Sequence, residues 1–437
     1  MMRESRRGGA PERSFMPSLS RKIDALPRGW YPGAPSPELT RAILAYRYVT
    51  PTSSLVERAF LNAFWEKAVL LVPRSVAPNT LTLMGGGICI AIYVLDWLLS
   101  PDGLGTARPT WLYALFALLF FLYQTLDGVD GKQARRTKSG SALGEIMDHG
   151  VDAIATGLVA LISADTFGFG LDSFVPWISA FGSQMAFYTS NLTLVHRGSQ
   201  KFLNIDITEL QWGLILCWIA TGVAGPGIWR GVVAVPEVVA PLCDVLGPAV
   251  FGLPAGPRPG LVEIRFIAAV IGVGGTVANF FLYSLNALPP YLARARPAHV
   301  VAGAPGTGLG QLALQVVGIS TYGALAFVAQ RRFATIPEAA LRHDALRALL
   351  LGSCFAFGDQ VNRLLLMRVA HHRVPFVSPA LVLMSGFAAL SFVDLTVRWW
   401  WAVAAACVVA HQLLLLWIAR TFAQILKIAV FRTRSSS

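Results

Sequence analysis

The sequence predicts an all-α polytopic membrane protein with about ten transmembrane helices and an N-terminal interfacial amphipathic helix. Of its 437 residues, 54% are hydrophobic and only 14% are charged, and the mean hydropathy is +0.56. Soluble domains usually carry about 25% charged residues. Apolar runs recur from Leu81 almost to the C-terminus, and about 20 consecutive apolar residues are what a bilayer-spanning helix requires. These observations exclude an ordinary soluble domain.

Two segments precede the first apolar run. Residues 1–36 are rich in Arg, Ser, Gly and Pro and lack the apolar stretch of a signal peptide, so we expect a disordered basic tail in the cytosol. Residues 37–78 mix apolar and aromatic side chains, such as Tyr46 and Phe60, with Arg and Glu. This mixture predicts an amphipathic helix in the membrane interface, with an ordinary cytosolic packing helix as the alternative.

The apolar runs predict ten spanning helices, six within residues 79–290 and four within residues 291–437. Their expected bounds are about 80–99, 110–126, 143–164, 172–194, 210–232, 263–287, 309–329, 346–368, 376–396 and 400–426. Residues 224–260 are rich in Gly, Pro and Val and predict a long non-cytosolic loop.

Basic residues predict the orientation of these spans. The connection between the second and third spans carries Lys132, Arg135, Arg136 and Lys138, which the positive-inside rule places in the cytosol. One group of arginines falls on the predicted far side instead, before and at the start of the eighth span: Arg331, Arg332, Arg342 and Arg347.

The remaining composition excludes several classes of function. Topology and anionic lipid headgroups account for the net charge of +12, so we expect no nucleic acid partner. The five cysteines are scattered and form no CxxC pair, which favours small buried side chains over a disulfide framework or a cysteine metal site.

Four aspartates lie at the cytosolic ends of the second and third spans. Asp127 and Asp130 are three residues apart, and Asp148 and Asp152 are four apart, so each pair shares one helix face. If the two helices pack antiparallel, the four carboxylates converge. Acidic side chains are costly inside a bilayer and indicate a functional site, although a structural pairing with Arg is the alternative.

Four converging carboxylates require a positive counter-charge. Oxygen ligands at this density suit Mg²⁺ or Mn²⁺, and two ions that share a carboxylate are suited to displacement at phosphorus. The sequence therefore predicts a site for two divalent ions.

The residues around the aspartates suit a phosphorylated substrate. Gly131 and Ala134 keep the backbone open beside the carboxylates, and Gly144 lies one turn before Asp148 on the same face. Lys132 and Arg135 offer positive charge to a diphosphate.

This pattern resembles the signature of the CDP-alcohol phosphotransferase family. It reads D-x-x-D-G-x-x-A-R, then eight residues, then G-x-x-x-D-x-x-x-D. More narrowly, the segments DGVDGKQARRT and LGEIMDHGVD are similar to those of the eukaryotic choline/ethanolamine phosphotransferases. The resemblance is strong over residues 40–215 and implies that residues 79–290 form the catalytic core. It leaves residues 291–437 as a four-span region for lipid binding or dimerisation.

The resemblance implies a reaction and its partners. Phosphoethanolamine or phosphocholine would pass from CDP-ethanolamine or CDP-choline to diacylglycerol, releasing CMP. The setting would be the endoplasmic reticulum or Golgi membrane, with the active site facing the cytosol, other membrane lipids as neighbours and a homodimer as the assembly. The alternatives are a phosphatidyltransferase that uses CDP-diacylglycerol and a secondary transporter with a carboxylate ion site.

The resemblance also implies roles for single residues. Asp127, Asp130, Asp148 and Asp152 would bind the metals. The base that takes the lipid's proton would be Asp152, with His149 as the competitor because imidazole titrates near neutrality.

Further roles concern the substrates. The CDP moiety would contact Gly131, Lys132, Ala134, Arg135, Gly144 and Asn79; for Asn79 a helix cap is the alternative. Glu209 would touch the headgroup or only flank the fifth span. For Glu145 we expect an interface charge, with a contact to the metal ligands as the alternative.

Overall fold

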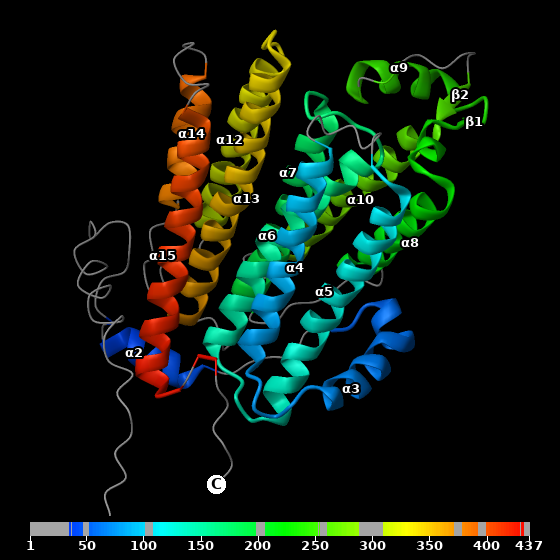
Figure 1. Cartoon of the computed structure of the whole chain (residues 1–437). Helices are drawn as coiled ribbons and strands as arrows, with labels where there is room; N and C mark the ends of the chain where they lie inside the picture. Colours follow the sequence, from blue (N-terminus) through cyan, green and yellow to red (C-terminus); the bar gives the residue numbers. More distant parts are fainter. Residues whose placement is uncertain are drawn as a thin grey trace, which may run out of the picture.

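The computed structural model is a bundle of long helices (Figure 1). It describes residues 35, 37–46, 52–100, 108–197, 206–251, 253, 260–287, 309–370, 378–391, 399–428 and 430–431. The predicted tail lies outside these residues except for position 35. The all-α prediction is confirmed, since the described part is helical apart from short turns and one two-stranded sheet.

Each of the ten predicted segments contains a helix. These helices are α4 (Pro78–Leu99), α5 (Thr110–Arg136), α6 (Ala142–Thr166), α7 (Phe174–Arg197), α8 (Ile207–Ala224), α10 (Ile264–Ala287), α12 (Leu309–Phe333), α13 (Ala339–Ala370), α14 (Pro379–Leu390) and α15 (Trp400–Leu426). Within the described chain, six are long and apolar enough to cross a membrane: α4, α5, α6, α8, α10 and α15. The chain is therefore a polytopic membrane protein by length and composition.

Two predicted helix ends and one predicted loop differ from the structure. The second predicted span continues past residue 126 to Arg136, so the whole first half of the aspartate motif is helical. The fifth ends at Ala224 instead of residue 232, because Gly225 adopts a φ of +82° that ends the helix. The predicted loop at 224–260 contains a 3₁₀ helix, η2 (Pro226–Arg230), strands β1 (Val232–Ala234) and β2 (Leu261–Glu263), and α9 (Ala240–Phe251).

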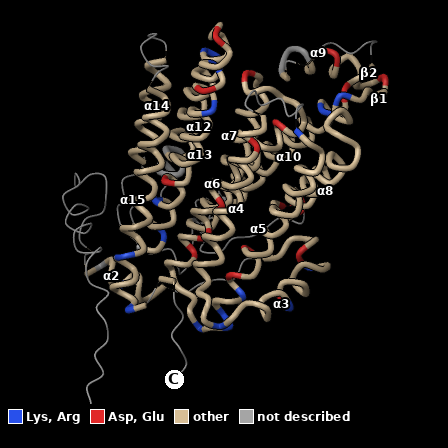
Figure 2. The backbone as a smooth tube through the Cα atoms, in the orientation of Figure 1, with Lys and Arg blue, Asp and Glu red and all other residues tan. Residues whose placement is uncertain are grey.

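The segment before the first span is helical in three pieces: α2 (Pro37–Ala45), the π-helix η1 (Glu57–Leu61) and α3 (Asn62–Leu71). In Figure 1, α3 runs across the lower end of the bundle instead of along it. Phe60, Phe64 and Leu71 are exposed there, beside the Lys and Arg that gather at this end (Figure 2). Exposed apolar residues next to basic ones fit the predicted interfacial position.

The two helices that carry the four aspartates, α5 and α6, pack at the centre of the bundle. α4 contacts α5 and α6, α6 contacts α7, and α7 contacts α10. From the C-terminal region, α13 packs against α6 and α7 as well as against α14 and α15. Residues far apart in the sequence therefore support the helix that carries Asp148 and Asp152.

The exceptional arginines belong to the end of α12 (Arg331, Arg332) and the first part of α13 (Arg342, Arg347). These parts of the two helices lie at the opposite end of the bundle from α3 (Figure 2). Two of them are engaged by the protein itself: Arg342 Nε lies 3.7 Å from Asp172 Oδ2, and buried Arg347 donates to the carbonyl of Ser100. Internal partners reduce the free positive charge on that side, so the loop does not contradict the predicted orientation.

Candidate metal and substrate site

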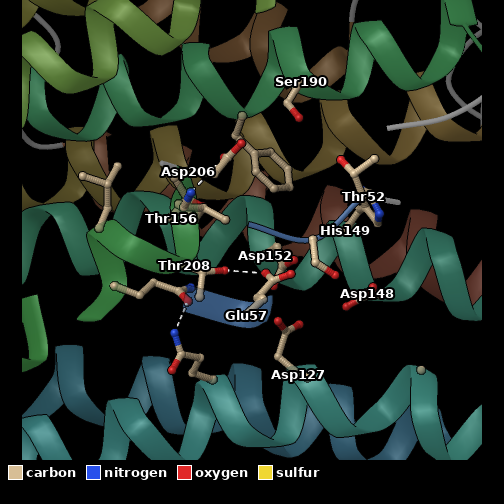
Figure 3. Close-up of a pocket in the computed structure, with 18 of the residues that line it drawn as sticks. Thr52, Glu57, Asp127, Asp148, His149, Asp152, Thr156, Ser190, Asp206 and Thr208 are labelled. Carbon is tan, nitrogen blue, oxygen red and sulfur yellow. Dashed lines mark hydrogen bonds between the residues drawn. The ribbon is translucent and has the colours of Figure 1, made fainter. Parts of the chain in front are cut away.

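A polar pocket of about 290 Å³ opens among α5, α6, α7, α8, α10 and the segment around η1 (Figure 3). Its walls carry most of the residues that the sequence singled out and several that it did not. The acidic side chains in these walls are Glu57, Asp127, Asp130, Glu145, Asp148, Asp152 and Asp206.

The centre of the polar pocket is a carboxylate cluster formed by Asp127, Asp148 and Asp152. One oxygen from each lies within 4.8 Å of the other two. Oδ1 of Asp148 is buried and accepts no hydrogen bond from the described residues. Three carboxylate oxygens at this spacing, together with a buried Asp148 oxygen that lacks a hydrogen bond, match the ligands that Mg²⁺ or Mn²⁺ binds.

Asp130 lies outside this set of three. It lines the same pocket and is buried, and its Oδ2 accepts a hydrogen bond from the Thr82 hydroxyl of α4. Its predicted part in the metal site stays a prediction.

A short chain of hydrogen bonds orients His149. The Asn191 amide nitrogen donates to the Phe187 carbonyl at 2.9 Å, which leaves Asn191 Oδ1 as an acceptor 2.6 Å from His149 Nδ1. The proton of a neutral imidazole therefore sits on Nδ1, and Nε2 carries the lone pair. Asp152 is oriented differently, because its Oδ1 accepts from the Tyr123 hydroxyl at 2.7 Å.

The residues predicted for the CDP moiety fall into two groups. Gly131, Lys132 and Arg135 line the polar pocket. Ala134, Gly144 and Asn79 are not among its described lining residues.

Asn79 is hydrogen-bonded to a residue close to the C-terminus. It is not the N-cap of α4, because Ala77 holds that position. Its amide donates to the Val430 carbonyl at 2.9 Å, and a Cβ on Gly144 would lie 3.6 Å from its Oδ1. The cap interpretation of Asn79 is therefore wrong.

Glu209 stabilises the start of α8. Its carboxylate accepts from the backbone N–H groups of Asp206 and Val56, both at 2.8 Å, and it forms a capping box with Asp206. These contacts favour the flanking role over contact with a headgroup.

Glu145 lies in the first turn of α6, as expected for the end of the span, but it is buried and engaged by other side chains instead of being an exposed charge. Its two oxygens accept from the Tyr46 hydroxyl and the Arg368 guanidinium, which come from the N-terminal segment and α13. Burial and the Glu145 carboxylate raise the pKa of Tyr46, so the phenol stays protonated and acts as a donor. Two segments far apart in the sequence thus meet on α6, the helix that carries Asp148 and Asp152.

Sequence reasoning missed two of the residues in this region. Glu57 reaches the pocket from η1, where it accepts from the Thr208 hydroxyl (Figure 3). Asn191 fits a glycosylation triplet, which we discount because it lies within an apolar span. A polar amide in such a span was a usable signal, whereas nothing local marked Glu57.

An apolar cavity of about 520 Å³ adjoins the polar pocket, among α5, α6, α7, α8 and α10. Most of its walls are aliphatic or aromatic side chains, such as Phe120, Val159 and Ile267. Several residues line both spaces, Tyr123 among them. The carboxylate cluster therefore lies near the junction between a polar and an apolar compartment.

Comparison with known proteins matches the part of the chain that carries these aspartates. Residues 75–224 match the CDP-alcohol phosphatidyltransferase family, so this part of the chain is a domain of that kind and the predicted resemblance is confirmed. All four aspartates lie within it.

The similar proteins include cholinephosphotransferases. The chain is 36% identical to cholinephosphotransferase 1 of Danio rerio over 202 residues, covering 46% of this chain and 52% of that protein. It is 32% identical to the Homo sapiens protein of that name, covering 47% and 50%. It is 37% identical to an uncharacterised CDP-alcohol phosphatidyltransferase class-I family protein of Dictyostelium discoideum, covering 43% and 49%. The matches span about half the length of these relatives.

Proposed function

We propose that this protein transfers phosphocholine or phosphoethanolamine from the CDP-alcohol to diacylglycerol, releasing CMP. The observation that carries the proposal is the carboxylate cluster at the junction of the polar pocket and the apolar cavity. A water-soluble nucleotide and a membrane lipid need such adjoining compartments. The cholinephosphotransferases among the similar proteins support this choice of substrates.

The metal site of this proposal consists of Asp127, Asp148 and Asp152, with Asp130 beside them. Mg²⁺ or Mn²⁺ bound there supplies positive charge that offsets the charge developing on the transferred phosphoryl group. The unsatisfied Oδ1 of Asp148 supports this assignment. Lys132 and Arg135 neutralise the rest of the diphosphate.

His149 takes the proton from the lipid's hydroxyl in this mechanism, and Asp152 stays a ligand. The family resemblance favours Asp152 as the base, but the contacts support the histidine. Its Nδ1–H donates to Asn191, which leaves Nε2 free to accept a proton. Asp152 belongs to the carboxylate cluster and already accepts from Tyr123.

The setting of the reaction belongs to the same proposal. The polar pocket faces the cytosol, in the endoplasmic reticulum or Golgi membrane, and the protein works as a homodimer. The Lys and Arg near α3, at the end of the bundle where α5 turns into α6, support this orientation.

A release assay tests the proposal. Purified protein in mixed micelles receives diacylglycerol, Mg²⁺ or Mn²⁺, and either CDP-choline or CDP-ethanolamine, and CMP is measured. We expect CMP release that requires the lipid, the cation and Asp127, with Asp127→Asn at least about 100-fold slower. No lipid-dependent CMP from either donor would sink the proposal. Turnover of CDP-diacylglycerol with a soluble alcohol instead would identify a phosphatidyltransferase.

A further inference from the structure

Five polar side chains line both the polar pocket and the apolar cavity. Two of them already donate their hydroxyl hydrogens, Tyr123 to Asp152 and Thr276 to the Val273 carbonyl. The other three are Thr156 from α6, Ser183 from α7 and Gln211 from α8. Thr156 lies one helical turn beyond Asp152 on the same face of α6. We call Thr156, Ser183 and Gln211 the polar collar.

The two hydroxyl groups of the polar collar differ from other hydroxyls on the same helices. Ser163 on α6 donates to the Val159 carbonyl at 2.6 Å, and Thr193 on α7 donates to the Thr189 carbonyl at 3.0 Å. Such bonds to the preceding turn use up the donor. Within the described chain, Thr156 and Ser183 make no hydrogen bond through their hydroxyls. Both donors therefore remain available to a ligand at the junction.

Gln211 adds a third donor of the same kind. Its Oε1 accepts from Gln124 Nε2 at 2.8 Å, which ties α8 to α5 and fixes the orientation of the carboxamide. The Nε2 group then faces away from Gln124, and no described residue accepts from it. The collar thus combines two hydroxyls and one amide N–H₂ between the cluster and an apolar space.

We propose that the polar collar binds the ester carbonyl groups of a neutral glycerolipid acceptor. An ester carbonyl only accepts hydrogen bonds, which matches a ring of donors. The acyl chains lie in the apolar cavity, and the lipid's free hydroxyl points toward Asp152 and His149. The inference rests on the proposed function and adds acceptor specificity, because a dialkyl ether glycerolipid has no ester carbonyl for the collar.

The test compares two acceptors, diacylglycerol and its dialkyl ether analogue, in mixed micelles with saturating CDP-choline. The variant is Thr156→Val with Ser183→Ala, which removes two hydroxyls at little change in volume. We expect its KM for diacylglycerol to rise about tenfold, as the loss of two hydrogen bonds implies. The KM for CDP-choline and the value for the ether analogue should stay unchanged. The ratio of activity with the diester to activity with the ether analogue should therefore be above one in the wild type and fall towards one in the double variant.

Ser163→Ala is the matched control, because its hydroxyl lines the same cavity but is bound to its own helix. It should keep the wild-type preference. An unchanged preference in the double variant, or an equal loss with both acceptors, would overturn the inference while wild-type turnover upholds the function. A wild-type enzyme that is inactive with diacylglycerol and both CDP-choline and CDP-ethanolamine would overturn the function itself, and with it the inference. Gln211 is left intact in this test because its loss would strand the buried Gln124 amide.

Discussion

At the scale of single residues, the site depends on side chains that orient other side chains. The side-chain amide of Asn191 has a fixed orientation, because its nitrogen donates to the Phe187 carbonyl and its oxygen faces His149. The residue is fully buried, so water does not replace it when it is removed. In the proposed mechanism, Asn191 therefore sets the tautomer and orientation of His149 without touching the substrate itself.

Asn191→Leu tests this role. Without the acceptor, His149 loses its fixed tautomer and ring orientation, and we expect kcat to fall about 10- to 100-fold with little change in either KM. Steady-state CMP release measures the effect. Thr193→Val, two residues along α7, is the control, because its hydroxyl bonds only to backbone carbonyls. Equal rates in wild type and Asn191→Leu would refute the role.

At the scale of elements, α13 packs against α6, the helix that carries Asp148 and Asp152. Gly150 lies between Asp148 and Asp152, and Asn362 of α13 packs against it so closely that a Cβ would lie 2.3 Å from the amide oxygen. The absence of a side chain at Gly150 therefore permits this approach. His411 of α15, 3.3 Å from the Asn362 amide, fixes the contact from the other side.

Gly150→Ala should separate the two helices. The added methyl group cannot fit beside a fully buried amide, and we expect a loss of about 1–3 kcal/mol in stability, seen as a lower midpoint of thermal unfolding in detergent. Gly87→Ala on α4 is the control, since nothing lies within 4 Å of its Cβ position. The combined variant Gly150→Ala, Asn362→Ala should recover part of the loss. An unchanged midpoint in Gly150→Ala would show that the contact is not tight.

The helices also show which features of the fold follow from short stretches of sequence and which do not. Ten apolar runs predict ten helices because burial in lipid depends on the run itself. The end of α5 was missed because Lys132 and Arg135 look like a connection, although their charged groups stand at the helix end in a polar pocket. The turn between α5 and α6 is short, and Ser141 caps α6 by accepting from Gly144 N–H at 3.3 Å. That turn brings the aspartate pairs together.

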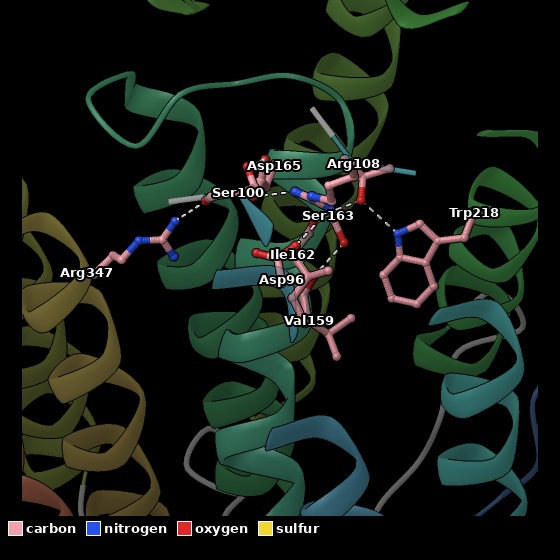
Figure 4. A network of polar contacts seen from close by, with 10 residues as sticks. Asp96, Ser100, Arg108, Val159, Ile162, Ser163, Asp165, Trp218 and Arg347 are labelled. Carbon is pink, nitrogen blue, oxygen red and sulfur yellow. Dashed lines mark hydrogen bonds and ion pairs between the residues drawn. The ribbon is translucent and has the colours of Figure 1, made fainter. Parts of the chain in front are cut away.

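At the scale of the whole molecule, a buried ionic network lies at the C-terminal ends of α4 and α6 (Figure 4). Arg108 pairs with Asp96 of α4, at 2.9 Å, and with Asp165 of α6. The Ser100 hydroxyl donates to Asp165 at 3.2 Å, while its carbonyl accepts from Arg347 of α13. All five residues are buried. The network joins α4, α6 and α13 at the end remote from the carboxylate cluster.

Arg108→Met tests the network. It leaves two buried carboxylates without their shared partner, and breaking such a pair costs about 3–5 kcal/mol. We expect a clearly lower unfolding midpoint, with normal KM values for the fraction that stays folded. Asp172→Asn is the control, because its pair with Arg342 is partly exposed and such pairs contribute little. Equal midpoints for the two variants would argue against the network.

The sequence by itself determined the all-α membrane fold, the four aspartates and the family domain, because periodicity, hydropathy and motif spacing are local properties. Only the tertiary structure separated Asp130 from the carboxylate cluster, tied His149 to Asn191 and placed Glu145 between Tyr46 and Arg368. The polar collar also exists only where α6, α7 and α8 converge. These features depend on contacts between residues tens to hundreds of positions apart, whose distances no local pattern encodes.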